Sequence, residues 1–149
     1  MPDDNIQKLA HKNYLAMIEN SLGVNLFRNF YVRFKDTLIE KDVMENGNKS
    51  CAFYTSAILT LNGLIKKTHA TVDSVIKDME ESGWIKTDNP KQGDIIVWEE
   101  KEGATHIGFW WNALEAISNS STEKFPVKHD LTYDDTRKIT AIYTKDIQE

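Results

Sequence analysis

Apolar side chains recur at helical spacing in three segments of the first 82 residues. Residues 3–20, 51–62 and 71–82 each carry an apolar stripe with a period close to that of an α-helix. Each segment begins beside a residue that can cap a helix and is followed by a glycine: Asp3 or Asp4, Ser50 and Thr71 at the starts, and Gly23, Gly63 and Gly83 after the ends. The pattern therefore predicts three helices.

Short apolar runs replace the helical spacing in the second half of the chain. Runs suited to strands occupy residues 26–34, 95–98, 106–111, 115–118 and 138–144. Residues 36–50 are polar and contain Asn46-Gly47-Asn48, which is a turn signature. Because the helices come first and most strands follow, we expect the α+β class, with N-terminal helices packed on an antiparallel sheet of about four to six strands.

The length and composition are those of one domain. The chain has 149 residues, of which 40% are hydrophobic and 28% are charged. No repeat or linker divides it, so we expect a single domain in which residues 45–149 form the core and residues 1–44 add a helix and a strand. Four aromatic side chains in this extension should need a core to bury them: Phe27, Phe30, Tyr31 and Phe34.

The charge and the cysteine content exclude several classes of function. With 18 Lys and Arg against 23 Asp and Glu, the net charge is −5, which argues against nucleic-acid binding, and no polybasic patch suits a membrane surface. A single cysteine excludes an intramolecular disulfide and any multi-cysteine metal motif. No apolar run approaches the roughly 20 residues that span a bilayer, and the acidic N-terminus does not resemble a secretory signal. We therefore expect a cytoplasmic protein without a metal or cofactor, of undetermined oligomeric state.

Cys51 is the strongest candidate for a reactive residue. It lies in the first turn of the helix predicted at 51–62, directly after the polar turn. Backbone N–H groups and the positive end of the helix dipole meet there, so the position favours a thiolate and could hold the oxyanion of an acyl-transfer intermediate. The alternative interpretation is a small buried apolar residue, which is a common use of a lone cysteine.

A cysteine nucleophile needs a base, and His106 at the start of a predicted strand is the candidate. A third polar residue should orient the imidazole, and the return strand of the predicted hairpin offers two. If the turn is centred just after Asn112, Asn119 lies opposite His106; if it is centred on Asn112, Ser118 does. We favour Asn119, because an amide oxygen accepts the imidazole N–H more firmly than a hydroxyl does.

The other histidines point less clearly to a function. His69 directly precedes a predicted helix, where local packing is the simpler interpretation. Zinc binding by Cys51, His69 and His106 is not favoured, because the sequence lacks the paired-ligand spacing of a zinc site. His11 and His129 have no partner that the sequence identifies.

Three segments together resemble a known group of enzymes: Ser50-Cys51-Ala52-Phe53-Tyr54-Thr55-Ser56, Gly93-Asp94-Ile95-Ile96-Val97-Trp98 and His106-Ile107-Gly108-Phe109-Trp110. In this order, over about residues 45–145, they resemble the NlpC-type and CHAP-type superfamily of papain-like cysteine peptidases and amidases. The resemblance implies that Cys51 is the nucleophile, His106 the base and Asn119 the orienting residue, with Asp94 as a structural turn residue. The third residue is often a histidine in NlpC-type members and a glutamate or asparagine in CHAP-type members. Asn119 fits the CHAP-type pattern, whereas strict NlpC-type spacing selects Ser118.

By this resemblance we expect a thiol-dependent hydrolase of amide bonds that acts on a peptide or peptidoglycan-type substrate through an acyl-enzyme and needs no cofactor. Many members of the superfamily are secreted and carry wall-binding modules, and neither feature is recognisable in this sequence. Two alternatives stay open, because a fold does not decide a function. One is a catalytically silent relative that binds a peptide or a protein partner. The other is an acyltransferase or deamidase that uses the same Cys–His pair.

Overall fold

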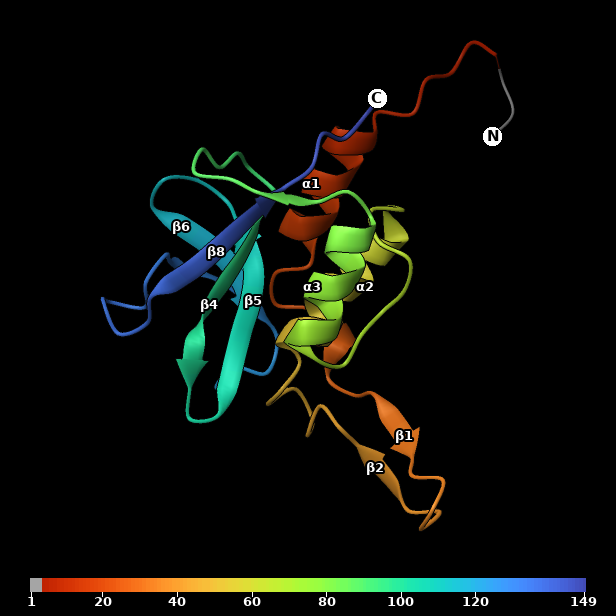
Figure 1. The fold of residues 1–149 in the computed structure, drawn as a ribbon. Coiled ribbons are helices and arrows are strands. Elements are labelled where there is room, and N and C mark those ends of the chain that lie inside the picture. The colour runs from red at the N-terminus through yellow and green to blue at the C-terminus, as the bar shows by residue number, and fades with distance from the viewer. Residues whose placement is uncertain (1–3) are drawn as a thin grey trace.

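A six-stranded antiparallel sheet forms the centre of the computed structural model, which describes residues 4–149 (Figure 1). The strands lie in the order β3-β8-β4-β5-β6-β7. Their bounds are β3 Ile85–Lys86, β4 Ile95–Lys101, β5 Ala104–Trp110, β6 Glu115–Asn119, β7 Pro126–Asp130 and β8 Ile139–Thr144. The expected α+β class is confirmed, as are the four strands predicted in the second half of the chain. The sequence pattern does not predict β3 and β7.

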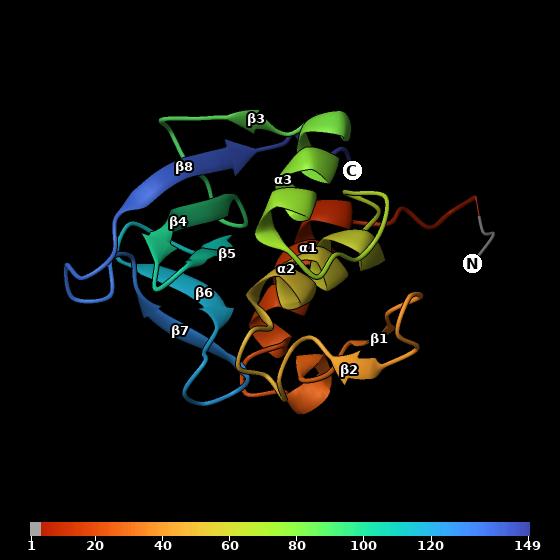
Figure 2. The same cartoon turned by 60° about the horizontal axis from the view of Figure 1, so that its bottom comes forward.

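Three helices, α1 (Ala10–Asn20), α2 (Cys51–Leu61) and α3 (Val72–Glu81), cover one face of this sheet (Figure 2). The bounds of α2 and α3 confirm the helices predicted at these positions. Thr71 caps α3 by accepting a hydrogen bond from a backbone N–H, whereas the side chain of Ser50 makes no such bond at the start of α2. Within residues 4–149, no helix combines the length and the apolar character needed to cross a membrane.

The first helix is shorter than predicted. It begins at Ala10, so Asp4 lies before it, and Asp3 falls outside the described residues. Within the helix, the side chains of Tyr14 and Ile18 are fully buried, whereas the apolar side chains of the preceding segment are about half exposed. Because a short helix is stabilised mainly by burial of its apolar face, the segment whose apolar side chains stay half exposed is not helical.

The strand predicted at 26–34 is wrong as a continuous element. Its first part is the 3₁₀-helix η1 (Asn25–Phe27), and its last part is β1 (Tyr31–Arg33). This strand pairs with β2 (Glu40–Asp42), which lies in the region predicted to be a turn, and the two form a ribbon that projects from the body (Figure 1). The turn predicted at Asn46-Gly47-Asn48 is present.

The aromatic side chains of this N-terminal segment divide into two groups. Phe27 is buried, and the ring of Phe30 lies 5.0 Å from that of Phe53 on α2. Tyr31 and Phe34 remain 73% and 47% exposed, so the expectation that they need the core is wrong. The reason is that a two-stranded ribbon has no second layer to cover its side chains.

Both faces of the central sheet are apolar. The face under the helices contributes Ile95, Val97, Ile107, Phe109 and Ile117. The opposite face contributes Ile96, Trp98 and Ala116, with Leu131 and Tyr133 from the loop after β7. Because side chains alternate along a strand, His106, Gly108 and Ser118 belong to the second face and Asn119 to the first.

A turn at Gly93-Asp94 begins β4 and joins three parts of the chain. The Asp94 carboxylate is buried and accepts hydrogen bonds from the Lys91 backbone N–H and from the Thr144 hydroxyl, both at 2.8 Å. The Tyr14 hydroxyl on α1 donates to the Gly93 carbonyl at 2.6 Å. Asp94 is therefore a structural turn residue, as predicted, and the same turn holds α1 against the sheet.

Candidate active site

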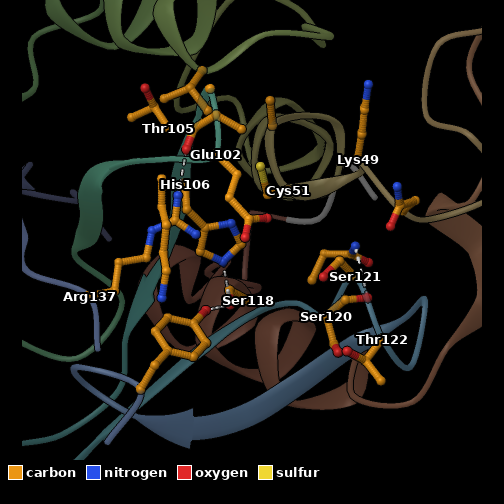
Figure 3. A pocket seen from close by; sticks show the side chains of 18 of the residues that line it. Lys49, Cys51, Glu102, Thr105, His106, Ser118, Ser120, Ser121, Thr122 and Arg137 are labelled. Atoms are coloured by element: carbon orange, nitrogen blue, oxygen red, sulfur yellow. Dashed lines mark hydrogen bonds between the residues drawn. The ribbon is translucent and has the colours of Figure 1, made fainter. Parts of the chain in front are cut away.

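A cleft of about 860 Å³ opens where α2 begins beside the sheet (Figure 3). The start of α2, the turn between β4 and β5, the strands β5 and β6, and the loop after β7 supply its walls. Cys51, His106 and Ser118 all line this cleft, and so does Asn119. The residues that the sequence analysis singled out thus come from three separate parts of the chain, α2, β5 and β6, to one cavity.

Cys51 is the first residue of α2. The first hydrogen bond of the helix runs from the Tyr54 N–H to the Ser50 carbonyl, so the N–H groups of the preceding residues, including Cys51, have no partner within the helix. The sulfur accepts a hydrogen bond from the backbone N–H of Ile107, the neighbour of His106 in sequence. This contact brings the thiol to strand β5 beside the candidate base.

Burial raises the pKa of the Cys51 thiol. Hydrogen bonds from the N–H groups of Ile107 and Ala52 and the positive charge of Arg137 oppose this rise without overcoming it. Burial therefore acts against the thiolate that a helix N-terminus favours, and the pKa of Cys51 lies above its ordinary value in the free protein. The sulfur carries its proton at neutral pH.

His106 lies near the start of β5, with its imidazole packed against the Trp98 ring at a centroid distance of 5.1 Å. Its Nε2 atom is 2.9 Å from the Ser118 hydroxyl oxygen, and the other ring nitrogen, Nδ1, is on the side of Cys51 (Figure 3). Burial, followed by the positive charge of Arg137 and by His129, lowers the pKa of His106 to about 3. The imidazole is therefore neutral at neutral pH.

The register of the β5–β6 hairpin decides which polar residue meets the imidazole. The observed pairs are Phe109↔Ile117 and Trp110↔Ala116. The turn is thus centred on Ala113. A turn centred one residue earlier, on Asn112, would have placed Ser118 directly opposite His106. Ser118 instead lies across from Gly108, where an added Cβ would come within 2.6 Å of the Ser118 Cβ. Because Gly108 has no side chain, the imidazole of His106 reaches Ser118 diagonally on the same face.

Asn119 does not contact His106. It lies on the face under the helices, where its side-chain amide donates to the Gly47 carbonyl at 2.9 Å. Its buried Oδ1 atom has no hydrogen-bond partner among residues 4–149. The expected contact between Asn119 and the imidazole is therefore wrong, because neighbouring strand residues point to opposite faces. The observed role of Asn119 is to tie β6 to the turn that precedes Cys51.

Arg137 is a charged residue of this site that the sequence analysis missed. Its guanidinium donates to the Glu99 carbonyl at 3.0 Å and to the Ala104 carbonyl at 2.6 Å, which fixes the cation at the β4–β5 hairpin. The charge acts on both reactive groups, since it favours a thiolate at Cys51 and disfavours an imidazolium at His106. The sequence around Arg137 contains no motif that predicts this role, because its hydrogen-bond partners are backbone carbonyls more than 30 residues away.

His129 and Tyr133 complete the surroundings of Ser118. The Ser118 hydroxyl oxygen lies 2.7 Å from His129 Nε2 and 2.9 Å from the Tyr133 hydroxyl. His129 lies in a run of three polar residues, Lys128-His129-Asp130, which carries no strand signal, so the sequence pattern does not indicate β7. Tyr133 has no such signal either, because it lies in a loop where it and the next two residues adopt left-handed backbone conformations.

The remaining histidines lie outside this arrangement. His69 Nε2 is 2.7 Å from a carboxylate oxygen of Asp78 on α3, and its backbone N–H donates to Ser56 on α2, in line with the predicted local packing. Among residues 4–149, no group of three or more His, Cys, Asp or Glu side chains is arranged to hold a metal ion.

Comparison with known proteins gives a structural match without a sequence match. No family model matches the chain, and no curated protein does. The structure of NlpC2 from Trichomonas vaginalis is similar, with a TM-score of 0.54 and 14% sequence identity. The match covers 94% of this chain and 50% of that chain, so this chain spans about half the length of that protein. The order of helices and antiparallel strands, the position of Cys51 at a helix start and this match together identify the fold as an NlpC-like variant of the papain fold.

Proposed function

We propose that the protein is a thiol-dependent hydrolase of amide bonds in which Cys51 is the nucleophile, His106 the base and Ser118 the residue that orients the imidazole. The observation that carries this proposal is the convergence of these three side chains in one cleft. The imidazole is bound to Ser118 through Nε2, which leaves Nδ1 on the side of the thiol. A nucleophile, a base and an orienting group in this order are the elements of a cysteine hydrolase.

The proposed reaction begins with attack of the Cys51 sulfur on the substrate carbonyl carbon, while His106 Nδ1 takes the thiol proton. The backbone N–H of Cys51 donates a hydrogen bond to the oxyanion. The C–N bond then breaks, and the imidazolium returns its proton to the leaving amine. Water, deprotonated by His106, hydrolyses the resulting thioester and restores the thiol.

Burial affects the timing of the proton transfer. Cys51 and His106 are both neutral in the free protein, because burial disfavours a charge on either group. A proton that moves from the sulfur to the imidazole creates two opposite charges side by side, and each offsets the other. We therefore expect the transfer to accompany attack on a bound substrate rather than to precede it. The substrate class that fits is a peptide or peptidoglycan-type amide.

Cleavage of a pooled library of short amidated peptides, followed by mass spectrometry, tests the proposal. We expect wild type to cleave a subset of peptides, and Cys51→Ala and His106→Ala each to abolish this cleavage. The double variant should be no slower than either single variant, because the two residues act as one unit. Equal cleavage by wild type and Cys51→Ala would overturn the proposal.

A second function, binding without turnover, is favoured by one observation. Burial raises the pKa of the Cys51 thiol, as expected for a structural cysteine. If the protein binds peptides without turnover, wild type and Cys51→Ala should retain the same peptides of the library, and these peptides should be recovered uncleaved. An acyltransferase or deamidase would instead form new products when a primary amine such as glycinamide is added to the library as an acceptor.

A further inference from the structure

Ser118 belongs to a hydrogen-bonded group that extends beyond the candidate active site. His106, His129 and Tyr133 surround its hydroxyl, and all three rings pack near Trp98 on the sheet face away from the helices. His129 and Tyr133 also stack on each other at a centroid distance of 4.2 Å. Nothing in the proposed reaction uses His129, although it is partly buried and shares its hydrogen-bond partner with the base.

The position of the proton on His129 follows from its backbone contact. His129 Nδ1 lies 2.7 Å from the Asp130 carbonyl oxygen. A carbonyl oxygen can only accept a hydrogen bond, so Nδ1 carries a proton. Burial lowers the pKa of His129, which keeps the ring neutral at neutral pH. In a neutral imidazole the second nitrogen is an acceptor, so Nε2 of His129 accepts a hydrogen bond.

This assignment makes Nε2 of His129 an acceptor for one of two nearby hydroxyl groups. Two hydroxyl oxygens lie near His129 Nε2, that of Ser118 at 2.7 Å and that of Tyr133 at 3.1 Å. We assign the single acceptor position to the shorter contact, so the Ser118 hydroxyl supplies the proton. The Ser118 oxygen then has two lone pairs to accept with. One takes the Tyr133 hydroxyl at 2.9 Å, and the other takes His106 Nε2, also at 2.9 Å. In this arrangement His106 carries its proton on Nε2, and Nδ1 is unprotonated.

We propose that His129 is a positioning residue, which acts through Ser118 to hold His106 in the tautomer that presents an unprotonated Nδ1 to Cys51. A serine hydroxyl alone cannot fix a tautomer, because it donates and accepts equally well. Anchored by the Asp130 carbonyl, His129 removes this ambiguity by taking the only Ser118 proton. The contribution of His129 to catalysis rests on the proposed function, whereas its effect on the tautomer does not.

The tautomers can be measured directly in the full chain labelled with ¹⁵N-histidine, by long-range ¹H–¹⁵N correlation spectra at neutral pH. We expect His106 to be protonated on Nε2 and His129 on Nδ1. A wild-type spectrum with His106 protonated on Nδ1, or with His129 protonated on Nε2, would overturn the proposal. This measurement needs neither a variant nor a substrate.

Two substitutions of His129 separate positioning from simple packing. His129→Phe keeps a ring against Tyr133 but removes the acceptor, so the Ser118 proton becomes free to turn to His106 Nε2. We expect the His106 signals to move towards a mixture of tautomers. His129→Gln places an amide oxygen near the former Nε2 and should restore the wild-type pattern. An unchanged His106 tautomer in His129→Phe would contradict the role of His129.

The matched control is Lys128→Ala, on the same strand. Lys128 points to the other face of the sheet, where its amine lies over the Trp111 ring, so the His106 tautomer should not change.

With an amide substrate from the peptide library, His129→Phe should lower kcat about tenfold at unchanged KM, as outer partners of an oriented histidine do. If the tautomers behave as expected but wild type cleaves no peptide, the proposed function fails and the positioning role of His129 stands.

Discussion

Ser118 and Asn119 are neighbours on β6, yet they lie on opposite faces of the sheet and make different contacts. The Ser118 hydroxyl meets the imidazole of His106, while the Asn119 amide meets the Gly47 carbonyl. An amide is the better acceptor for an imidazole N–H, but the geometry of the strand does not let Asn119 compete. Position on the strand, rather than the strength of the acceptor, selects the partner of His106.

Substitution of each neighbour should therefore affect a different property. We expect Ser118→Ala to lower turnover by roughly 10- to 10⁴-fold, the range seen when an orienting or acid–base group is lost. Asn119→Ala loses a buried hydrogen bond and should lower the free energy of unfolding by about 1–2 kcal/mol. Peptide cleavage rates and thermal unfolding of both variants check this. A larger loss of turnover in Asn119→Ala than in Ser118→Ala would contradict it.

The protonation of Cys51 gives a prediction about pH. Because burial raises the pKa of this thiol, the folded protein keeps the proton over a pH range in which a free thiol has already lost it. We expect iodoacetamide to alkylate Cys51 more slowly than it alkylates glutathione at about pH 9, near the ordinary pKa of a thiol. Intact-mass measurement follows the reaction, with the protein unfolded in urea as control. A rate that reaches its plateau below neutral pH would contradict the prediction.

The β5–β6 hairpin is the element that orders the site. Its short turn sets the register, and Gly108 opens the space through which His106 reaches Ser118. A Cβ at this position would lie 2.6 Å from the Ile117 carbonyl oxygen as well as from the Ser118 side chain. Such distances are too short for a Cβ atom, so the two strands would have to move apart.

Gly108→Ala should therefore damage both the stability and the site. We expect the free energy of unfolding to fall by about 1–3 kcal/mol, as in other overpacked interiors, and the cleavage rate to fall with it. Ala113→Ser, at the exposed turn of the same hairpin, is the control and should leave the unfolding temperature unchanged. An alanine variant as stable as wild type would show that the hairpin tolerates the added methyl group.

In the whole molecule, the N-terminal segment is packed onto the same core as the site. Tyr14 and Ile18 of α1 are fully buried, and Phe27 and Phe30 contact the aromatic ring of Phe53 on α2. This is the helix that begins with the candidate nucleophile. The β1–β2 ribbon, by contrast, projects from the body with exposed apolar side chains (Figure 2).

We expect residues 1–44 to unfold together with the rest of the chain. Trypsin should cut first in the exposed ribbon, and the two fragments should stay associated through α1 and η1. The chain 45–149 expressed alone should not show a cooperative thermal transition, because it would expose the apolar surfaces that α1 and η1 cover. Size-exclusion chromatography and calorimetry test this. A stable, cooperatively folding chain 45–149 would show that the segment is an accessory.

The elements of local origin were predictable from the sequence. The helix that starts at Cys51 follows from its apolar spacing, its polar preceding turn and the glycine after its end. The strand after Gly93-Asp94 and the strand that carries His106 follow from short apolar runs. These signals lie within about ten residues of the feature that they predict, so no tertiary contact is needed to interpret them.

The parts that depend on distant residues were decided by the tertiary structure. A shift of one residue in the β5–β6 pairing moves the side chains of β6 to opposite faces and exchanges Ser118 for Asn119 on the side of His106, and the turn residues alone left the register open. Burial of Cys51 requires α2 to lie against β5, and the bond from Ser118 to His129 requires β7 to pair with β6. The sequence by itself determined which residues carry reactive groups. Only packing between elements determined which of them meet and which protonation state each one holds, because desolvation and hydrogen-bond direction depend on neighbours that are remote in the chain.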